Sequence, residues 1–154
     1  MRKQDPSFDF YQFENKVTYI FKSLMLAFYR DDIKTIELLA SEIGAAMLIS
    51  IVKERITKKL ELMYKEMLYI DDARYHDSII DGEEVRLQFM INVQETLCLI
   101  DKNDKTIKDG SPTKIENCHY LIEIMKNPEP KEELVGHNWV ITKVIRTGVV
   151  EQLI

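Results

Sequence analysis

The stretch that decides the fold has the sequence EVRLQFMINVQETLCLI and runs from residue 84 to residue 100. Its even positions are mainly polar. Its odd positions are mainly large and apolar, and they are Val85, Leu87, Phe89, Ile91, Val93, Leu97 and Leu99. This alternation with a period of two predicts a strand that has one face buried and the other in water. We therefore interpret the rest of the chain around this strand.

One charged residue, Glu95, interrupts the apolar face of the strand. A carboxylate at such a position is paired, lines a cavity, or marks a β-bulge that shifts the phase of the strand. We predict that Glu95 is a buried polar group. Its partner would be Arg86, Arg146, a lysine or backbone N–H groups.

Length and composition indicate one globular domain over residues 1–154. The chain has a mass of 18.1 kDa, and 45% of its residues are hydrophobic, which is enough for a core. Its net charge is −5, with both signs spread along the chain, so nucleic-acid binding has no electrostatic support. No direct nucleic-acid partner is expected.

The two cysteines, Cys98 and Cys118, form no CxxC motif, and we interpret them as reduced, half-buried thiols; a disulfide between them is the alternative. No secretory signal is predicted. The most apolar run, residues 43–52, is shorter than the about 20 apolar residues that span a bilayer. A transmembrane segment is therefore not predicted.

Apolar spacing predicts three helices in the N-terminal part of the chain. The first covers residues 10–30, the second covers residues 33–43, Gly44 breaks the pattern, and the third covers residues 45–62. The first helix has an apolar stripe that consists of Phe13, Val17, Ile20, Phe21, Leu24 and Phe28. Such a stripe is typical of core packing, and the alternative is a hydrophobic pocket or docking surface.

The third helix changes character along its length, because its first half is apolar and its second half is basic. We favour a helix that is buried at one end and solvated at the other. The alternative is a helix that lies on an anionic membrane or partner surface. In that case the contacting residues would be Lys53, Arg55, Lys58 and Lys59.

The remaining part of the chain has the patterns of strands. Extended segments are predicted at residues 67–80, 115–125 and 138–149, and Asp81-Gly82 is a hairpin signal before the central strand. In the segment 115–125, one face carries Cys118, Tyr120, Ile122 and Ile124. Three helices followed by a meander of about four antiparallel strands predict an α+β fold.

Several short motifs resemble one family in their order and spacing. They are DPSF at residues 5–8, QE at 94–95, Tyr120 followed by NPE at 127–129, and HNWVI at 137–141 followed by VIRTG at 144–148. Together they resemble the C-terminal domain of the matrix-side scaffold of the mitochondrial presequence translocase, the Tim-forty-four-like family. A related domain occurs in a large-subunit mitoribosomal protein.

The resemblance implies a nuclear-transport-factor-two-like cone, in which a curved sheet wraps a long helix and encloses a hydrophobic pocket for lipid or a partner. We expect this pocket to be lined by Phe13, Phe21, Phe28, Leu87, Phe89 and Trp139. The resemblance also implies a scaffold or adaptor without chemistry, peripheral to the matrix side of the mitochondrial inner membrane. Its partners would be protein subunits of a larger complex and the anionic lipid cardiolipin.

The full import scaffold has a chaperone-engaging N-terminal half and two lipid-contacting helices before this domain. Here only four residues precede Asp5. An accessory structural subunit of the mitoribosome or of a respiratory-chain complex is therefore the alternative expectation.

An enzyme of the same fold, an isomerase or dehydratase, would need a carboxylate with a titratable partner inside the cone. The candidates are Glu95, His76 and His119, and no pair of them converges by pattern. A metal site at His76 and its acidic neighbours lacks ligand spacing, and no glycine-rich phosphate loop is present. We predict no catalytic residue, no metal and no cofactor.

Overall fold

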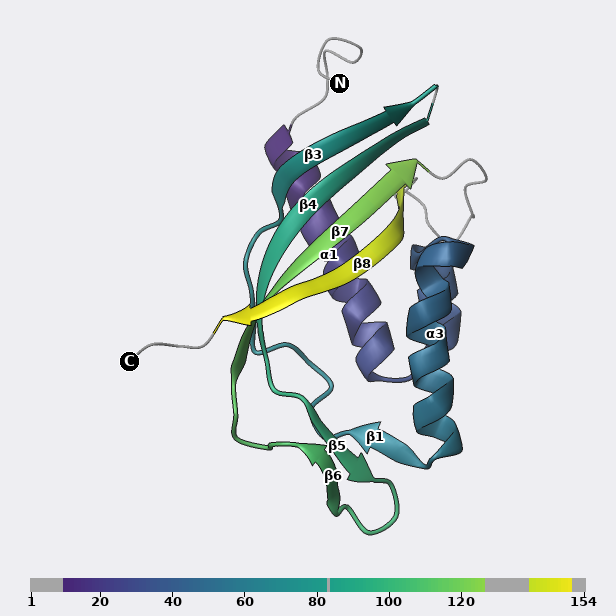
Figure 1. Cartoon of the computed structure of the whole chain (residues 1–154), viewed down its shortest axis with the longest axis vertical. Helices are drawn as coiled ribbons and strands as arrows, with labels where there is room; N and C mark the ends of the chain where they lie inside the picture. The colour runs from purple at the N-terminus through teal and green to yellow at the C-terminus, as the bar shows by residue number, and fades with distance from the viewer. Residues whose placement is uncertain (1–9, 83, 127–138, 151–154) are drawn as a thin grey trace.

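The computed structural model describes residues 10–82, 84–126 and 139–150, and the side chains of residues 12–82, 84–126 and 139–147. Within these ranges, three helices precede eight strands (Figure 1). The helices are α1 (Phe10–Tyr29), α2 (Ile33–Leu39) and α3 (Glu42–Thr57). The strands are β1 (Leu60–Leu62), β2 (Tyr69–Ile70), β3 (Arg74–Asp81), β4 (Glu84–Glu95), β5 (Cys98–Asp101), β6 (Ile107–Gly110), β7 (Glu116–Lys126) and β8 (Trp139–Val150).

The strands form two antiparallel sheets. In the larger sheet, β2 and β3 both pair with β4, β4 pairs with β7, and β7 pairs with β8. In the smaller sheet the order is β1-β5-β6. The α+β prediction is therefore confirmed, although the larger sheet alone has five strands rather than about four.

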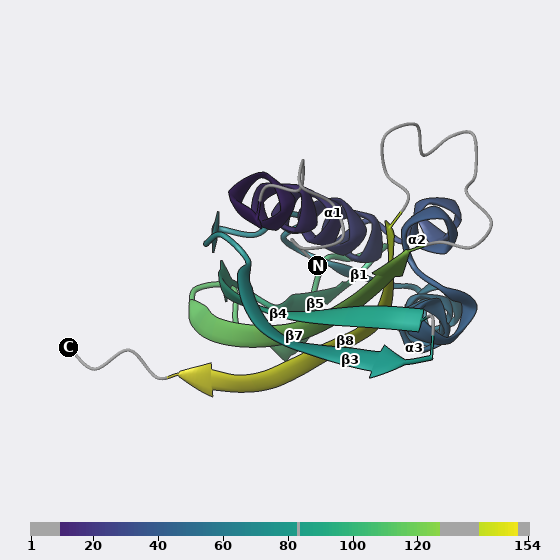
Figure 2. The ribbon, with the colours of Figure 1, turned by 90° about the horizontal axis from the view of Figure 1, so that it is seen from above.

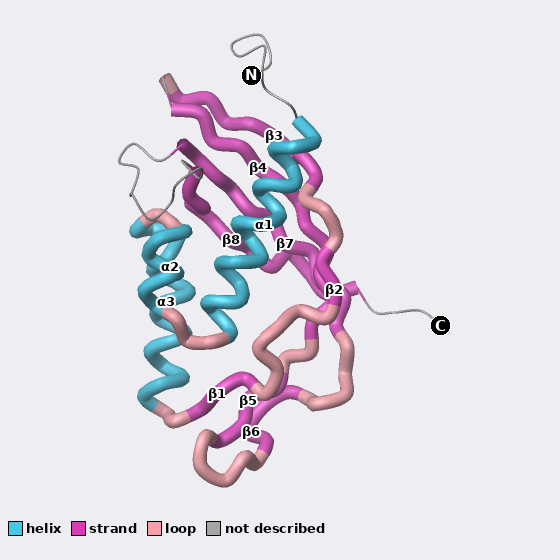
Figure 3. Tube along the Cα trace, turned by 180° about the vertical axis from the view of Figure 1, so that it is seen from behind, coloured by secondary structure: helices cyan, strands magenta, loops and turns pink. Residues whose placement is uncertain are grey.

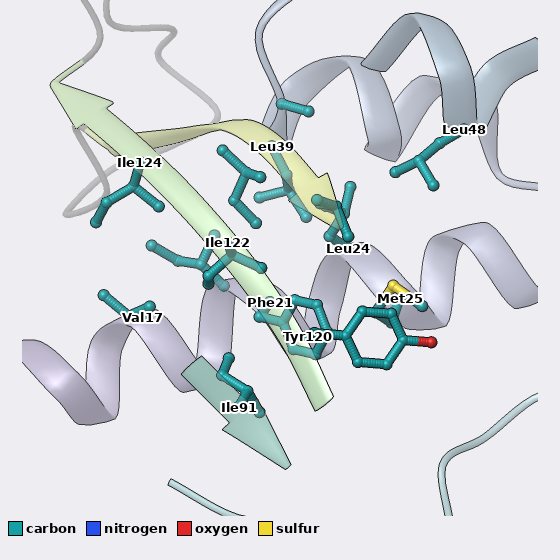
Figure 4. Close-up of a cluster of buried hydrophobic side chains, with 14 of the residues drawn as sticks. Val17, Phe21, Leu24, Met25, Leu39, Leu48, Ile91, Tyr120, Ile122 and Ile124 are labelled. Carbon is teal, nitrogen blue, oxygen red and sulfur yellow. The ribbon is translucent and has the colours of Figure 1, made fainter. Parts of the chain in front are cut away.

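Helix α1 lies across one face of the larger sheet, and the core fills the space between them (Figure 2). Val17, Phe21 and Leu24 of α1 point toward Ile91 and Ile122 of the sheet, and all five side chains are buried (Figure 4). Burying one such side chain contributes about 1.5–3 kcal/mol. The helix and the sheet are thus held together mainly by apolar contact.

The boundaries of α2 and α3 differ from the prediction. Helix α2 ends at Leu39, and Ser41 caps α3 by accepting a hydrogen bond from the amide of Gly44 at 3.0 Å. Gly44 therefore lies in the first turn of α3 rather than between helices. A Cβ atom at Gly44 would lie 2.6 Å from the carbonyl oxygen of Ile141, so glycine allows α3 to approach β8 closely.

The stretch at residues 84–100 is two strands rather than one. Strand β4 ends at Glu95, and β5 begins at Cys98 in the smaller sheet. The buried positions also change parity, because Cys98 and Ile100 are buried while Leu97 and Leu99 are half-buried. Glu95 itself stays on the buried face of β4, so the phase shift follows Glu95 and does not occur at it.

The family motifs at residues 5–8, at 127–129 and at 137–138 lie outside the described residues.

Candidate functional site

A pocket of about 490 Å³ opens between the second half of α3 and the smaller sheet, beside the C-terminal end of α1. Figure 3 shows these elements around the lower end of the molecule. Its apolar lining consists of Phe28, Ile51, Leu60, Leu62, Leu97 and Leu99. Its other lining residues are Glu54, Arg55, Lys58, Cys98, Asp109, Gly110, Glu116 and Arg146. The site is therefore an apolar hollow with charged groups at its wall and rim.

The pocket exists because β1 and β5 turn away from the larger sheet. Helix α3 ends at Thr57, and Lys59 has a φ of 57°, so the chain reverses into β1 directly below the helix. Pairing of β1 with β5 then places the smaller sheet opposite α3. Leu62 of the core and Leu97 and Leu99, which pack against it, line this space.

Arg55 forms part of the pocket wall and is only 6% exposed. Its guanidinium forms an ion pair with Asp31 at 2.9 Å, donates a hydrogen bond to the carbonyl of Phe28, and lies 4.5 Å from the centre of the Phe28 ring. Among the described residues, none offers an acceptor to its buried Nε–H. Burial lowers the pKa of Arg55, and the charge of Asp31 opposes this shift.

Asp31 is positioned for this ion pair by the end of α1. It has a φ of 59°, a left-handed conformation that aspartate adopts more readily than most residues and that turns the chain out of the helix. The cationic group of Arg55 consequently lies beside the last carbonyls of α1, where the helix dipole favours positive charge. This contact fixes the angle between α1 and α3.

Glu95 lies at the centre of a second buried polar cluster and is 1% exposed. Its Oε1 accepts a hydrogen bond from the Tyr120 hydroxyl at 2.6 Å and lies 3.3 Å from Nε of Arg146. Its Oε2 accepts a hydrogen bond from the Tyr29 hydroxyl. The prediction that Glu95 is a buried, paired carboxylate agrees with these contacts. Of the two arginines considered, Arg146 is the partner, whereas Arg86 pairs with Glu84 and Glu123.

The cluster extends beyond Glu95 through Arg146. The Arg146 Nη2 atom lies 2.5 Å from Oε2 of Glu116 and 2.8 Å from Sγ of Cys118. Burial, followed by the charge of Glu95, raises the pKa of Cys118 to about 11. The same two causes raise the pKa of Tyr29 and of Tyr120 above the usual range of a phenol. These groups therefore stay protonated at neutral pH and act as donors to Glu95.

This arrangement does not assemble the predicted candidates for catalysis. Both carboxylate oxygens of Glu95 are engaged, and Glu95 does not line the pocket. His119 bonds to Asn92, and His76 is exposed on β3. Among the described residues, no group of histidine, cysteine and acidic side chains is arranged to hold a metal ion.

The predicted lining of the pocket is wrong for most of its residues. Phe13, Phe21, Leu87 and Phe89 are buried in the core between α1 and the larger sheet. Trp139 packs edge-on against Phe13, with ring centroids 5.0 Å apart, and does not line the pocket. Only Phe28 does. The reason is that the space between α1 and the sheet is filled by side chains, and the hollow lies beyond the end of that layer.

The prediction that Arg55 belongs to an exposed basic face is wrong. The predicted lysines are exposed, but one of them is paired with an acidic residue. Arg55 is buried and faces Asp31. Lys53, Lys58 and Lys59 are exposed, and Lys58 forms an ion pair with Glu54 at 2.7 Å. The local positive charge is therefore smaller than four basic residues suggest.

Sequence reasoning missed Tyr29 as a donor to Glu95 and missed the residues of the smaller sheet that line the pocket. Tyr29 is separated from Glu95 by 66 positions, and no local spacing links them. For the pocket residues of the smaller sheet, the sequence does contain a signal. It is the pair of apolar residues Leu97 and Leu99, which follow the end of β4 and are half-buried.

The chain is an α+β domain with an apolar pocket, and the basic side chains around the pocket are paired with acidic ones. These features are typical of the class of binding or scaffold domains. The chain belongs to the Tim44-like domain family, whose model matches residues 1–146. The nuclear-transport-factor-two-like cone expected from the resemblance is thereby confirmed. Domains of this family act as non-catalytic scaffolds or adaptors in membrane-associated complexes.

A solved structure supports the fold. The crystal structure of the intermembrane space region of the chloroplast protein ARC6 has a TM-score of 0.59 and 16% sequence identity with this chain. The alignment covers 96% of this chain and 100% of that one. A comparison with curated proteins found no match. Among the described residues, no helix is both long and apolar enough to cross a membrane.

Proposed function

We propose that this domain is a non-catalytic scaffold of a complex at the matrix side of the mitochondrial inner membrane, and that its pocket holds a lipid chain or a hydrophobic segment of a partner. The observation that carries the proposal is the pocket of about 490 Å³, whose six large apolar side chains come from α1, α3, β1, β5 and the link between β4 and β5. A volume in this range suits small ligands or side chains of a docked segment. Protein import machinery is the first candidate, and the mitoribosome or a respiratory-chain complex is the alternative.

The charges around the pocket also support binding rather than chemistry. Arg55, Lys58 and Arg146 each have a carboxylate partner within 3 Å, namely Asp31, Glu54 and Glu116. Because these charges are paired within the chain, an occupant does not have to neutralise them.

Filling the pocket tests its role. Leu60→Trp introduces a large ring into the lining, and Ile107→Trp places the same ring on β6 of the same sheet, where Ile107 is 49% exposed and outside the pocket. Titration with the fluorescent fatty acid cis-parinaric acid should show saturable binding to the wild type and to Ile107→Trp, and weaker binding to Leu60→Trp. Equal binding by all three proteins would contradict the proposed pocket.

The membrane contact is tested separately by flotation with phosphatidylcholine vesicles that contain cardiolipin. Lys53 and Lys59 are the two lysines of this region that have no ion pair among the described residues. We expect the wild type to float and Lys53→Glu/Lys59→Glu to float less. If the wild type does not float, the lipid part of the proposal fails while the protein partners can still be identified by native co-purification.

A further inference from the structure

One side of α3 passes from the pocket onto the outer surface of the molecule. In the second half of this helix, the residues that line the pocket are Ile51, Glu54, Arg55 and Lys58. Met47 and Ile43 precede Ile51 in steps of four residues, so these three side chains lie along one side of the helix. Ile51 therefore belongs both to the pocket and to an apolar row that continues beyond the pocket.

The row becomes more exposed with distance from the pocket. The exposed fractions of Ile51, Met47 and Ile43 are 38%, 55% and 86%. Helix α3 stands at the side of the molecule (Figure 1). The small exposed residues Ala46 and Ser50 each follow a residue of the row by three positions, and therefore lie beside it. Small side chains at these positions let another chain approach the helix closely.

We propose that the pocket and the row form one docking site for an amphipathic helix of a partner protein. One apolar side chain of that helix enters the pocket, and others pack against Met47 and Ile43. Helices bind in this way through apolar anchors that are spaced three or four residues apart. This inference rests on the proposed binding role of the pocket, and it names the class of occupant.

The length of the docking site sets the length of the partner helix. The site runs from Ile43, at the exposed end of the row, to Lys58, at the pocket end of α3. These residues are fifteen positions apart in the sequence, which corresponds to about 22 Å along the helix axis. A partner helix of about four turns has the same length.

The exposed part of the row favours a helix over a lipid chain. A lipid chain is apolar on all sides, so any part of it that lay along Met47 and Ile43 would keep an apolar side in water. An amphipathic helix covers the row with its apolar side and keeps its polar side solvated. At the pocket end, Glu54 and Lys58 form an ion pair at 2.7 Å, so the partner does not have to neutralise either of them.

Peptide selection tests this docking site. A phage-displayed library of random sixteen-residue peptides, selected on the wild type, should yield peptides with apolar residues three and four positions apart. Met47→Glu and Leu60→Trp should bind these peptides about tenfold more weakly, because the first places a charge in the row and the second fills the pocket. Ile56→Glu is the matched control and should bind as the wild type does. Ile56 is 44% exposed on the same helix and lies about 140° around its axis from Ile51.

Binding of cis-parinaric acid separates this inference from the pocket itself. Met47 does not line the pocket, so Met47→Glu should bind the fatty acid as the wild type does. A failure of the wild type to bind it contradicts the pocket. Failure to select a helical peptide, or selected peptides that bind Met47→Glu or Leu60→Trp as strongly as the wild type, would overturn the docking site alone. The same holds if Met47→Glu instead abolishes vesicle flotation or self-association, since the row then contacts a membrane or a second copy.

Discussion

Glu95 and Arg55 are both charged and both buried, yet their surroundings differ. Glu95 has both oxygens engaged by donors from α1, β7 and β8. Arg55 has one carboxylate partner, Asp31, and its buried Nε–H has no acceptor in the described part of the chain. Glu95 lies behind Arg146, which lines the pocket, whereas Arg55 lies in the pocket wall itself.

Because of this difference, the surroundings of Glu95 and those of Arg55 have different roles. A buried charge whose bonds are all satisfied within the fold contributes to holding the fold together, because removal of any partner leaves an unpaired charge. A buried charge with a single carboxylate partner and one unsatisfied N–H is less fully compensated for its burial. The cluster of Glu95 therefore anchors α1 to the sheet, and the Arg55–Asp31 pair links α3 to the end of α1 beside the pocket.

The largest expected effect follows from Glu95→Ala. It leaves Arg146 and two tyrosine hydroxyls without their acceptor in a buried site, and we expect a loss of about 3–5 kcal/mol in the free energy of unfolding. Urea denaturation measures this loss. The control is Glu54→Ala, which removes an exposed carboxylate and should leave the denaturation midpoint unchanged. Similar midpoints for both variants would show that the cluster does not anchor the fold.

A smaller loss is expected for Arg55→Met. The change removes the partner of Asp31, which is only partly buried, and we expect a cost of about 2–3 kcal/mol in the free energy of unfolding. Adding Asp31→Asn should recover part of the loss, because asparagine is neutral and also tolerates the left-handed conformation at this position. If the double variant is less stable than Arg55→Met alone, the ion pair is not the source of the effect.

Tyr29→Phe should cost about 1–2 kcal/mol of the free energy of unfolding. The ring still packs, and only the donor to Oε2 of Glu95 is lost. Tyr69→Phe is a suitable comparison, because Tyr69 lies on β2 and is 56% exposed. Thermal denaturation of the two variants compares a buried with an exposed hydroxyl, and equal melting temperatures would contradict the role of Tyr29.

Alkaline pH should weaken the buried contacts around Glu95 without affecting the ion pair between Arg55 and Asp31. The pKa of Cys118 is raised from 9.0 to about 11 in the folded state, so the unfolded state loses its proton at lower pH. The resulting stability is complete below pH 9 and is lost as the pH rises from 9 to about 11. Denaturation midpoints measured across this range should fall, and the fall should be smaller for Cys118→Ala. An identical pH profile for the variant would exclude Cys118 as a contributor.

Periodicity predicted the elements that have a single buried face. The first helix was expected at residues 10–30 and is α1 (Phe10–Tyr29), because its apolar stripe recurs at helical spacing over five turns. The strand that contains Tyr120, Ile122 and Ile124 was also predicted with the correct buried face. The buried state of Glu95 followed from its place in the alternation, although its tyrosine partner on α1 did not.

The smaller sheet could not be predicted in the same way. Its strands β1, β5 and β6 have three or four residues each, too few for a pattern to emerge. The alternation in residues 84–100 also continues across the break at Thr96, so one long strand was expected. The pocket was then placed between α1 and the larger sheet, where the side chains in fact pack closely.

The sequence alone determined the order of the elements, the buried faces of α1, β4 and β7, and the membership of the family, because these depend on local spacing and short motifs. Tertiary structure decided where the pocket lies and which residues satisfy Glu95 and Arg55. The physical reason is that a cavity and a buried charge both depend on residues far apart in the chain. Tyr29, Tyr120 and Arg146 meet Glu95 only after α1 has packed on the sheet.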